Sequence, residues 1–349
     1  EREQTFTANC RLITAQVGRR YPALNPHRFL AIKNNPVTDL VAEAPIGPGR
    51  ITTYIEGNSS PRSEGISSQI GEVNGDARSA LDGDGKGRLQ VSEIYYTQKF
   101  GANILSLGLL DPTCRMDNSK IANNEAWQFL ANAFVNNPTI AFPDYTLGAC
   151  FHLERQSGYP GMNLLLTGSN GLADNPDRSY SELFDLAADG KGVFAVSEWY
   201  WRSQNSLWRL GLWLNSAETA YVDNSGRHGE NYGVYLTSDH TFDHYQLNLR
   251  LGMANEKVSA ASDFISLALQ TRVFDRILGL ALARTGVSEE LAGVRDDRYQ
   301  AEIYWRLSVM DGVHLSPTLQ WVRNSGFDAS DTGLKTDLFI YGLRASYLF

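Results

Sequence analysis

Short stretches of alternating apolar and polar residues recur from about residue 88 to the end of the chain, and clusters of Gly, Asn, Asp and Ser separate them. In the clearest stretch, residues 246–253, Leu247, Leu249 and Leu251 share one face, while polar or small residues share the other. Similar stretches lie at residues 208–214, 265–270, 300–307 and 339–349. Successive side chains of a β-strand point to opposite faces, so the pattern predicts an all-β protein of antiparallel strands joined by turns.

Alternation alone leaves two architectures open. In a soluble β-sandwich the polar face looks outward to water, whereas in a transmembrane β-barrel the apolar face looks outward to lipid and the polar face lines a channel. Aromatic residues crowd the predicted strand ends, where a membrane barrel places its interfacial girdles. They are Tyr95, Tyr96, Trp199, Trp201, Trp305, Trp321 and Tyr347. This feature favours the barrel over the sandwich.

The end of the sequence carries the strongest local signal. Phe339, Tyr341 and Leu343 share one face of the last stretch with Phe349, the final residue. An amphipathic terminal strand that closes on Phe resembles the recognition signal of bacterial outer-membrane proteins. A soluble edge strand with this many exposed aromatic side chains would promote aggregation. We therefore predict a transmembrane antiparallel β-barrel.

Composition agrees with a barrel and argues against other classes of protein. The 349 residues contain no apolar run near the roughly 18 residues that a membrane-spanning helix needs. A mean hydropathy of −0.30 fits strands whose lipid-facing and lumen-facing residues alternate. The formal charge of −8 and the lack of a Lys/Arg cluster argue against nucleic-acid binding. We expect a single barrel domain over residues 1–349, of which residues 1–50 are hard to assign to strands.

Residues 111–145 depart from the strand pattern and are predicted to form one long loop with a short helix at about residues 122–130. Long loops in compact folds are usually functional or disordered. This loop is rich in Trp, Phe and Ile, which argues against disorder. We therefore predict that residues 111–145 fold into the barrel and narrow its pore.

A calcium site is one interpretation of residues 82–93, which match part of an EF-hand loop through Asp82, Asp84 and Glu93. The match fails at the fifth position, where Lys86 places a cation at a ligand position. The flanking residues also alternate as strands do and do not form the two helices of the motif. An ordinary Asp/Gly turn is the better interpretation. We expect no bound metal and no cofactor.

Two glutamates raise the question of enzymatic activity. Residues 84–96 and 189–201 repeat a Gly-rich turn and a strand, and they place Glu93 and Glu198 at equivalent positions. Paired carboxylates next to aromatic residues are typical of glycoside hydrolases, but these two lie on separate predicted hairpins, so nothing fixes their separation. No G-x-S-x-G nucleophile motif is present. We predict that the protein is not an enzyme, with a barrel enzyme or an adhesin as the less favoured alternative.

The three cysteines, Cys10, Cys114 and Cys150, form no CxxC pair and hence no zinc motif. A disulfide between Cys114 and Cys150 in an oxidising compartment and three isolated thiols are both compatible with the spacing. The sequence leaves this choice open.

Charged and aromatic residues on the polar faces of the predicted strands are the candidate pore-lining residues. Opposed Arg and Glu side chains would set a transverse field and bind hydroxyl groups, and aromatic rings would offer surfaces for the C–H groups of sugars. The set is Glu93, Tyr95, Glu198, Tyr200, Arg209, Trp213, Arg250, Glu302, Arg306 and Arg344.

Several sequence segments resemble the carbohydrate-selective porin (OprB) family. They are residues 91–98 (VSEIYYTQ), residues 107–113 (LGLLDPT) and the motifs NNP and FPD within residues 136–144. The likeness covers roughly residues 50–349 and is most specific over residues 66–150. The N-terminal part departs from the pattern of the family, which leaves the strand count open.

The resemblance implies a 16-stranded barrel in the bacterial outer membrane, through which glucose and related small sugars diffuse passively. Loops folded into the lumen and arginines at the constriction are further features of the family. The expected partners are small sugars, outer-membrane lipid and lipopolysaccharide, and the expected assembly is a monomer or a homotrimer. A general porin, or a porin for another class of solute, is the main alternative.

Overall fold

A computed structural model gives the fold of most of the chain. It describes residues 6–10, 14–20, 33–35, 37–59, 70–75, 80–155, 159–175, 177–185, 191–291, 293, 296–324 and 337–348. Phe349, on which the predicted terminal signal depends, lies outside the described residues.

The described chain is almost entirely β-strand. The first strands are β1 (Phe6–Cys10), β2 (Thr14–Arg20), β3 (Lys33–Asn35), β4 (Val37–Ile46), β5 (Gly49–Asn58), β6 (Leu89–Phe100), β7 (Asn103–Leu110), β8 (Thr146–Leu153) and β9 (Gly161–Gly168). The later strands are β10 (Val193–Arg202), β11 (Ser206–Ala220), β12 (His228–Thr241), β13 (Tyr245–Ala254), β14 (Ala261–Val273), β15 (Arg276–Val287), β16 (Arg298–Met310), β17 (Val313–Arg323) and β18 (Leu338–Leu348). The helical segments are η1 (Gly71–Val73), α2 (Asn132–Val135) and η3 (Tyr180–Phe184), and none of them has the length and apolar character to cross a membrane.

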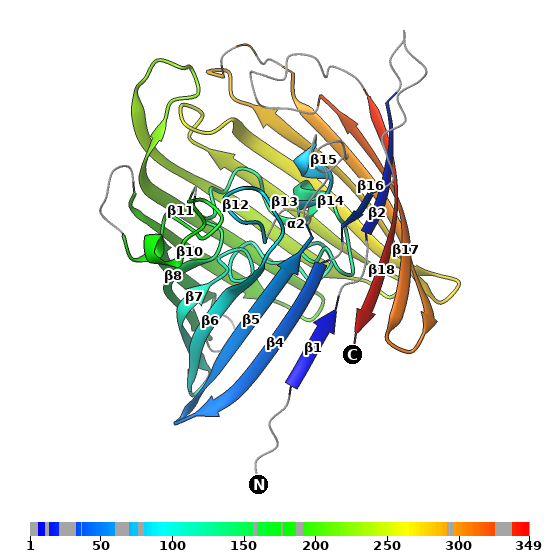
Figure 1. Cartoon of the computed structure of the whole chain (residues 1–349), viewed down its shortest axis with the longest axis horizontal. Helices are drawn as coiled ribbons and strands as arrows, with labels where there is room; N and C mark the ends of the chain where they lie inside the picture. The colour runs from blue at the N-terminus through cyan, green and yellow to red at the C-terminus, as the bar shows by residue number, and fades with distance from the viewer. Residues whose placement is uncertain are drawn as a thin grey trace.

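Each strand from β4 to β18 pairs antiparallel with the next, which makes one continuous sheet that curves round a central space (Figure 1). At the seam, β1 pairs with β4 on one side and with the end of β18 on the other, while β2 pairs with the remaining length of β18. The pairing of β1 with β18 covers only Asn9↔Leu348 and Cys10↔Tyr347, so this seam is the least continuous part of the sheet. Because β1 and β2 together occupy one strand position, the strand count is near the predicted 16, and the predicted β-barrel is confirmed.

The faces of the strands are inverted relative to a water-soluble protein. Along β11 the apolar side chains point outward and are exposed, Leu212 by 51%, while Gly211 and Trp213 between them face inward and are buried. On β14 the outward Leu267 is 48% exposed, whereas Arg250 on the neighbouring β13 faces inward and is 0% exposed. An apolar exterior around a polar interior is the arrangement that a surrounding lipid phase requires.

The two rims of the barrel differ. One rim carries turns of a few residues, such as those after β4, β10, β12, β14 and β16, while the other carries the long connections, including residues 111–145. Exposed aromatic side chains gather at the short-turn rim, as an interfacial girdle does. They are Trp201, Trp208, Phe242, Tyr245 and Phe274. Trp201 was predicted to belong to such a girdle, but placing Tyr95 there is wrong, because it lines an interior cavity.

Residues 111–145, the inward loop, run inside the barrel against the inner faces of β10 to β18 (Figure 1). The predicted helix at residues 122–130 is wrong, because these residues form turns and bends and the four-residue α2 follows them. Several of their backbone N–H groups bond to side chains, since Ala126 donates to the Asn124 side chain, and Asn123 and Asn124 donate to the Gln128 side chain. Such local side-chain and turn bonds compete with a helical ladder.

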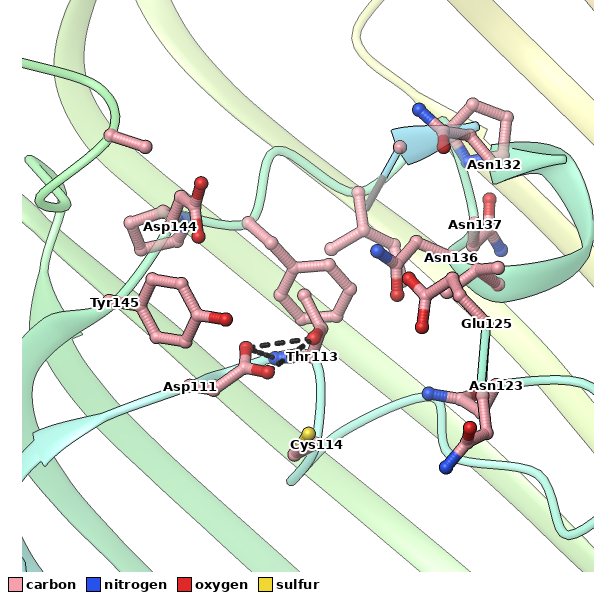
Figure 2. Close-up of a pocket in the computed structure, with 18 of the residues that line it drawn as sticks. Asp111, Thr113, Cys114, Asn123, Glu125, Asn132, Asn136, Asn137, Asp144 and Tyr145 are labelled. Atoms are coloured by element: carbon pink, nitrogen blue, oxygen red, sulfur yellow. Dashed lines mark hydrogen bonds between the residues drawn. The ribbon is translucent and has the colours of Figure 1, made fainter. Parts of the chain in front are cut away.

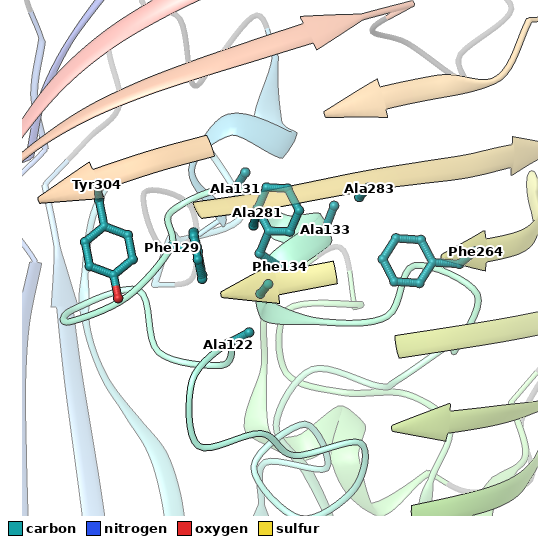
Figure 3. Close-up of a cluster of buried hydrophobic side chains, with 10 residues drawn as sticks. Ala122, Phe129, Ala131, Ala133, Phe134, Phe264, Ala281, Ala283 and Tyr304 are labelled. Carbon is teal, nitrogen blue, oxygen red and sulfur yellow. The ribbon is translucent and has the colours of Figure 1, made fainter. Parts of the chain in front are cut away.

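An apolar cluster packs the inward loop on the barrel wall (Figure 3). The ring of Phe129 contacts those of Phe134 and Tyr304, with centroids 5.4 and 5.0 Å apart. Small side chains on the wall make room for these rings. They are Ala268 on β14 and Ala281 and Ala283 on β15. At Gly252 an added Cβ would lie 2.1 Å from Thr139 Oγ1, so the wall needs glycine where the loop approaches it.

We expect Leu267→Arg to destabilise the barrel, because it places a charge on the lipid-facing surface of β14. The cost for Arg near the bilayer midplane is about 2–4 kcal/mol. Denaturant unfolding in lipid vesicles measures the free energy of unfolding, and Leu267→Ala is the control for lost volume. Equal losses in the two variants would contradict a lipid-facing position.

Candidate functional site

The inward loop is held by an ion pair buried inside the barrel. Arg250 on β13 places its Nε 3.2 Å from Asp117 Oδ2, and both side chains are almost fully buried. Its Nη groups donate to the carbonyl oxygens of Phe134 and Asp117, at 3.1 and 2.9 Å, and to the side chain of Asn123. Thr237 on β12 donates a further hydrogen bond to Asp117. Arg250 therefore ties together three separate points of the loop.

Burial raises the pKa of the Asp117 carboxyl, and the adjacent guanidinium of Arg250 opposes that increase. The two effects show why the pair is interdependent. A buried carboxylate without a cation would be costly, and so would a buried guanidinium without an anion. Removing either partner should therefore loosen the loop.

Carboxylates of the wall bind backbone N–H groups of the loop. The pairs are Glu93 with Asp111 at 3.1 Å, Glu198 with Asp117 at 3.0 Å, and Glu302 with Leu130 and Ala131 at 2.9 and 2.8 Å. Hydrogen bonds to an ionised acceptor are stronger than those between neutral groups. The three glutamates, all predicted from strand phase, thus contact the loop.

Arginines of the wall bind backbone carbonyl oxygens of the loop. Arg306 donates to the Trp127 oxygen at 2.9 Å, and Arg344 donates to the Glu125 oxygen. Arg209 differs, because it pairs at 3.3 Å with Asp239, and Asp239 accepts a 2.6 Å hydrogen bond from the Ser119 hydroxyl of the loop. The predicted arginines therefore bind the loop directly or through one carboxylate.

The predicted aromatic residues occupy three different surroundings. Tyr200 stacks on His152, with ring centroids 5.4 Å apart, and its hydroxyl donates to Glu154 at 3.1 Å. Trp213 is buried in an apolar cluster beside Phe194. Tyr95 faces the interior, and the Arg115 guanidinium lies 4.4 Å from its ring centroid.

A cavity of about 950 Å³, the lumen cavity, lies inside the barrel along the inward loop. Strands β4 to β6 form one side through Asp39, Val41, Thr52, Tyr54, Glu56, Glu93 and Tyr95. The loop contributes carboxylate, amide and aromatic side chains, including Asp111, Asn123, Glu125, Asn132, Asn136, Phe142, Asp144 and Tyr145 (Figure 2). Of the ten residues predicted to line the pore, Glu93 and Tyr95 line this cavity, and the other eight lie on inner-facing strand positions outside its lining.

Sequence reasoning missed most of the lining. Thr52, Tyr54 and Glu56 alternate with Ile51 and Ile55 along β5, but this signal precedes residue 88, from which the alternating stretches were recognised. The lining carboxylates of the connections lie outside any alternating stretch, so strand phase could not reveal them.

The cysteines and the EF-hand-like turn do not form additional sites. Cys114 and Cys150 are both free thiols, and the Cys114 side chain is exposed in the lumen cavity. Asp82 accepts a 2.7 Å hydrogen bond from the Lys86 backbone N–H, and Asp84 pairs with the Lys86 amine at 3.3 Å. Within the described residues no group of His, Cys, Asp and Glu is arranged to hold a metal ion.

Comparisons with known proteins agree on one family and one fold. A family model described as "Carbohydrate-selective porin, OprB family" matches residues 62–346. OprB of Pseudomonas putida superposes with a TM-score of 0.75 at 14% identity, covering 99% of this chain and 94% of that one. The outer membrane channel DcaP of Acinetobacter baumannii gives 0.60 at 10% identity, with 99% and 96% covered. OmpT of Vibrio cholerae, in its trimer form, gives 0.57 at 10% identity, with 99% covered of each chain.

A search of curated proteins found no match. The family match confirms the resemblance predicted from the sequence, and the structural matches confirm the porin-type barrel. The family description and the porin-type fold point to a transport channel.

We expect Arg250→Met to lower the free energy of unfolding by about 3–5 kcal/mol, because it leaves Asp117 buried without its cation. The freed loop should also be cut faster by trypsin at the exposed Lys120. Denaturant unfolding in detergent and limited proteolysis measure the two effects.

The matched control is Arg227→Met, which removes the exposed ion pair with Asp223 far from the loop in sequence. It should change neither measurement. An Arg250→Met protein that resists trypsin as wild type does would show that this ion pair does not hold the loop.

Proposed function

Because the chain belongs to the carbohydrate-selective porin (OprB) family, we propose that it is a bacterial outer-membrane channel through which small sugars, glucose among them, diffuse passively. The observation that carries the proposal is the lumen cavity, a space of about 950 Å³ inside a barrel with an apolar exterior. Its size and its polar lining suit a hydrated or hydroxylated small solute. No catalytic group is needed for passive diffusion.

The chemistry of the lining supports a sugar as the solute. Aromatic rings offer flat surfaces for the C–H groups of a pyranose, while carboxylates and amides bind its hydroxyl groups. Both kinds of side chain line the same space. The aromatic members are Tyr54, Tyr95, Trp127, Phe142, Tyr145 and Tyr347.

In this proposal the inward loop narrows the pore, and the predicted residues that contact the lumen or hold the loop have two different roles. Glu93 and Tyr95 meet the solute. Arg250, Arg306 and Glu302, by contrast, act through the loop that they hold. Replacing them should change the shape of the pore more than its surface.

The membrane orientation follows from the rims. Outer-membrane barrels have short periplasmic turns and longer extracellular loops. We therefore place the short-turn rim in the periplasm and the long connections outside, where lipopolysaccharide would surround them. OmpT of Vibrio cholerae is described in a trimer form. We extend the proposal to a homotrimer of this chain.

The exposed thiol of Cys114 tests the pore directly. We expect purified protein to conduct ions in planar bilayers, and a thiol-reactive quaternary ammonium reagent to lower the single-channel conductance by on the order of 10–50%, since the adduct occupies part of the lumen. The thiol faces the lumen cavity but lies deep inside the barrel, where partial removal from bulk water and the carboxylates of Asp111 and Glu93 raise its pKa, so labelling is done at alkaline pH. Cys114→Ser is the control and should be insensitive. A protein without conductance would refute the channel.

We expect Tyr54→Leu to weaken sugar binding in the lumen by about 1 kcal/mol, roughly fivefold in affinity, which is the scale of one aromatic contact. Sugar-induced current block measures the affinity. Tyr341→Leu on the lipid-facing side of β18 is the matched control and should leave the block unchanged. Liposome swelling that is equally fast for glucose and for amino acids of similar size would favour a general porin instead.

A further inference from the structure

The inward loop separates the charges of the barrel interior into a covered set and an open set. It lies on the wall of β10 to β18, where the guanidinium groups of Arg250, Arg306 and Arg344 are bonded to loop carbonyl oxygens. On the opposite wall, β4 to β6 present Asp39, Glu56 and Glu93 to the lumen cavity. The loop thus covers these three arginines together with the carboxylates of Glu198 and Glu302, while Asp39, Glu56 and Glu93 line the lumen cavity.

The lining of the lumen cavity is correspondingly acidic. Eight carboxylate side chains line it within the described residues, against two arginines, Arg178 and Arg298. The carboxylates are Asp39, Glu56, Glu72, Glu93, Asp111, Glu125, Asp144 and Asp174. A confined cavity with one predominant sign of charge focuses the electrostatic field and concentrates counter-ions.

Among the described residues, arginines form close ion pairs with two of these carboxylates. Arg298 lies 2.8 Å from Glu72, and Arg115 lies 3.5 Å from Glu93. Two further carboxylates accept hydrogen bonds from neutral groups. Asp111 accepts hydrogen bonds from the Thr113 backbone and hydroxyl, both at 2.8 Å, and Asp174 accepts from the backbone N–H groups of Asp144 and Gly171, both at 2.9 Å.

A buried donor in the same lining points to a ligand. Gln300 on β16 is 3% exposed and lines the lumen cavity, and its amide nitrogen has no hydrogen-bond partner among the described residues. Buried polar groups are usually bonded, so this N–H group is available to a hydroxyl oxygen of a solute. Carboxylates accept hydrogen bonds from hydroxyl groups and from ammonium groups. A hydroxylated solute with a positive charge matches both kinds of group.

We propose that the lumen cavity is a binding site for cationic sugars, with protonated amino sugars as the substrate class, and that the channel passes cations in preference to anions. This inference rests on the proposed porin function and specifies its solute. Side chains of Asp or Glu in a pore are a general basis for cation selectivity. Anionic sugars, such as uronic acids and sugar phosphates, are disfavoured by the same carboxylates.

The titration of Asp144 adds a dependence on pH. Burial, followed by the carboxylates of Asp174, Asp111 and Glu56, raises the pKa of Asp144, and Arg178 opposes this increase. Asp144 therefore carries less charge in acid and gains it as the solution is made more alkaline. The preference for cations should grow in the same direction.

The electrical test is the reversal potential in a KCl gradient across a planar bilayer. We expect a K⁺ to Cl⁻ permeability ratio of roughly 3 or more, because the lumen is narrow on the scale of the screening length at moderate salt. Asp111→Asn with Asp174→Asn should bring the ratio toward that of a neutral pore, since amides keep the hydrogen bonds and lose the charge. Asp243→Asn, in the exposed turn between β12 and β13, is the matched control and should leave the ratio unchanged.

The solute test uses liposome swelling with three sugars of similar size. Glucosamine should enter faster than glucose, and glucose faster than glucuronate. The double variant should bring the three rates closer together, while the control Asp243→Asn should keep the order of the wild type. Conductance without cation preference, or glucuronate entry as fast as that of glucosamine, would overturn this inference and leave the porin function intact. A protein without conductance would overturn the porin function, and this inference with it.

Discussion

A polypeptide in a lipid bilayer has no water to bind, so each backbone N–H and C=O group within the membrane must find its partner in the protein. The antiparallel ladder from β4 to β18 meets this requirement, and β1 and β2 continue it at the seam. The requirement also fixes the faces of every strand, because the outer face meets lipid and the inner face encloses polar groups. Leu212 and Trp213 lie one residue apart on β11 and still have opposite surroundings.

A polar interior creates a second requirement, since charges inside the barrel need partners. The inward loop supplies them from its backbone: Arg306 and Arg344 bind its carbonyl oxygens, and Glu302 binds its N–H groups. This explains why a segment rich in helix-compatible residues forms only four residues of α-helix. Backbone groups that bond to the wall are not available for a helical ladder. The shape of the loop is therefore set by the wall.

The sequence predicted the strands and their faces well, because alternation is a local property. Residues 246–253 indicated both β13 and the inward direction of Arg250. Alternation could not predict the partners of these side chains, because they are distant in sequence. Arg250 binds Phe134 across 116 positions, and Glu302 binds Leu130 across 172. No local pattern encodes a contact of that kind.

The candidate site was harder to predict for the same reason. Glu93 and Tyr95 were found from strand phase, and both line the cavity. Asp144 and Asp174 lie in connections, where the chain has no periodicity to indicate direction. The spacing of Cys114 and Cys150 left open whether they form a disulfide. The structure answers this, because both are free thiols. Resemblance to a family supplied the expected strand number and the class of solute but no residue of the lining.

The covered and open charges have different consequences for the pore. A guanidinium such as that of Arg250 acts on shape and on charge together, because removing it also frees the loop that it holds. A carboxylate such as Asp111, bonded within its own turn, acts mainly on charge. Arg250, Arg306 and Arg344 are therefore engaged in holding the loop, and in the proposed pore a solute meets mainly the carboxylates of the lining. In this proposal, selectivity depends on which charges the inward loop leaves uncovered.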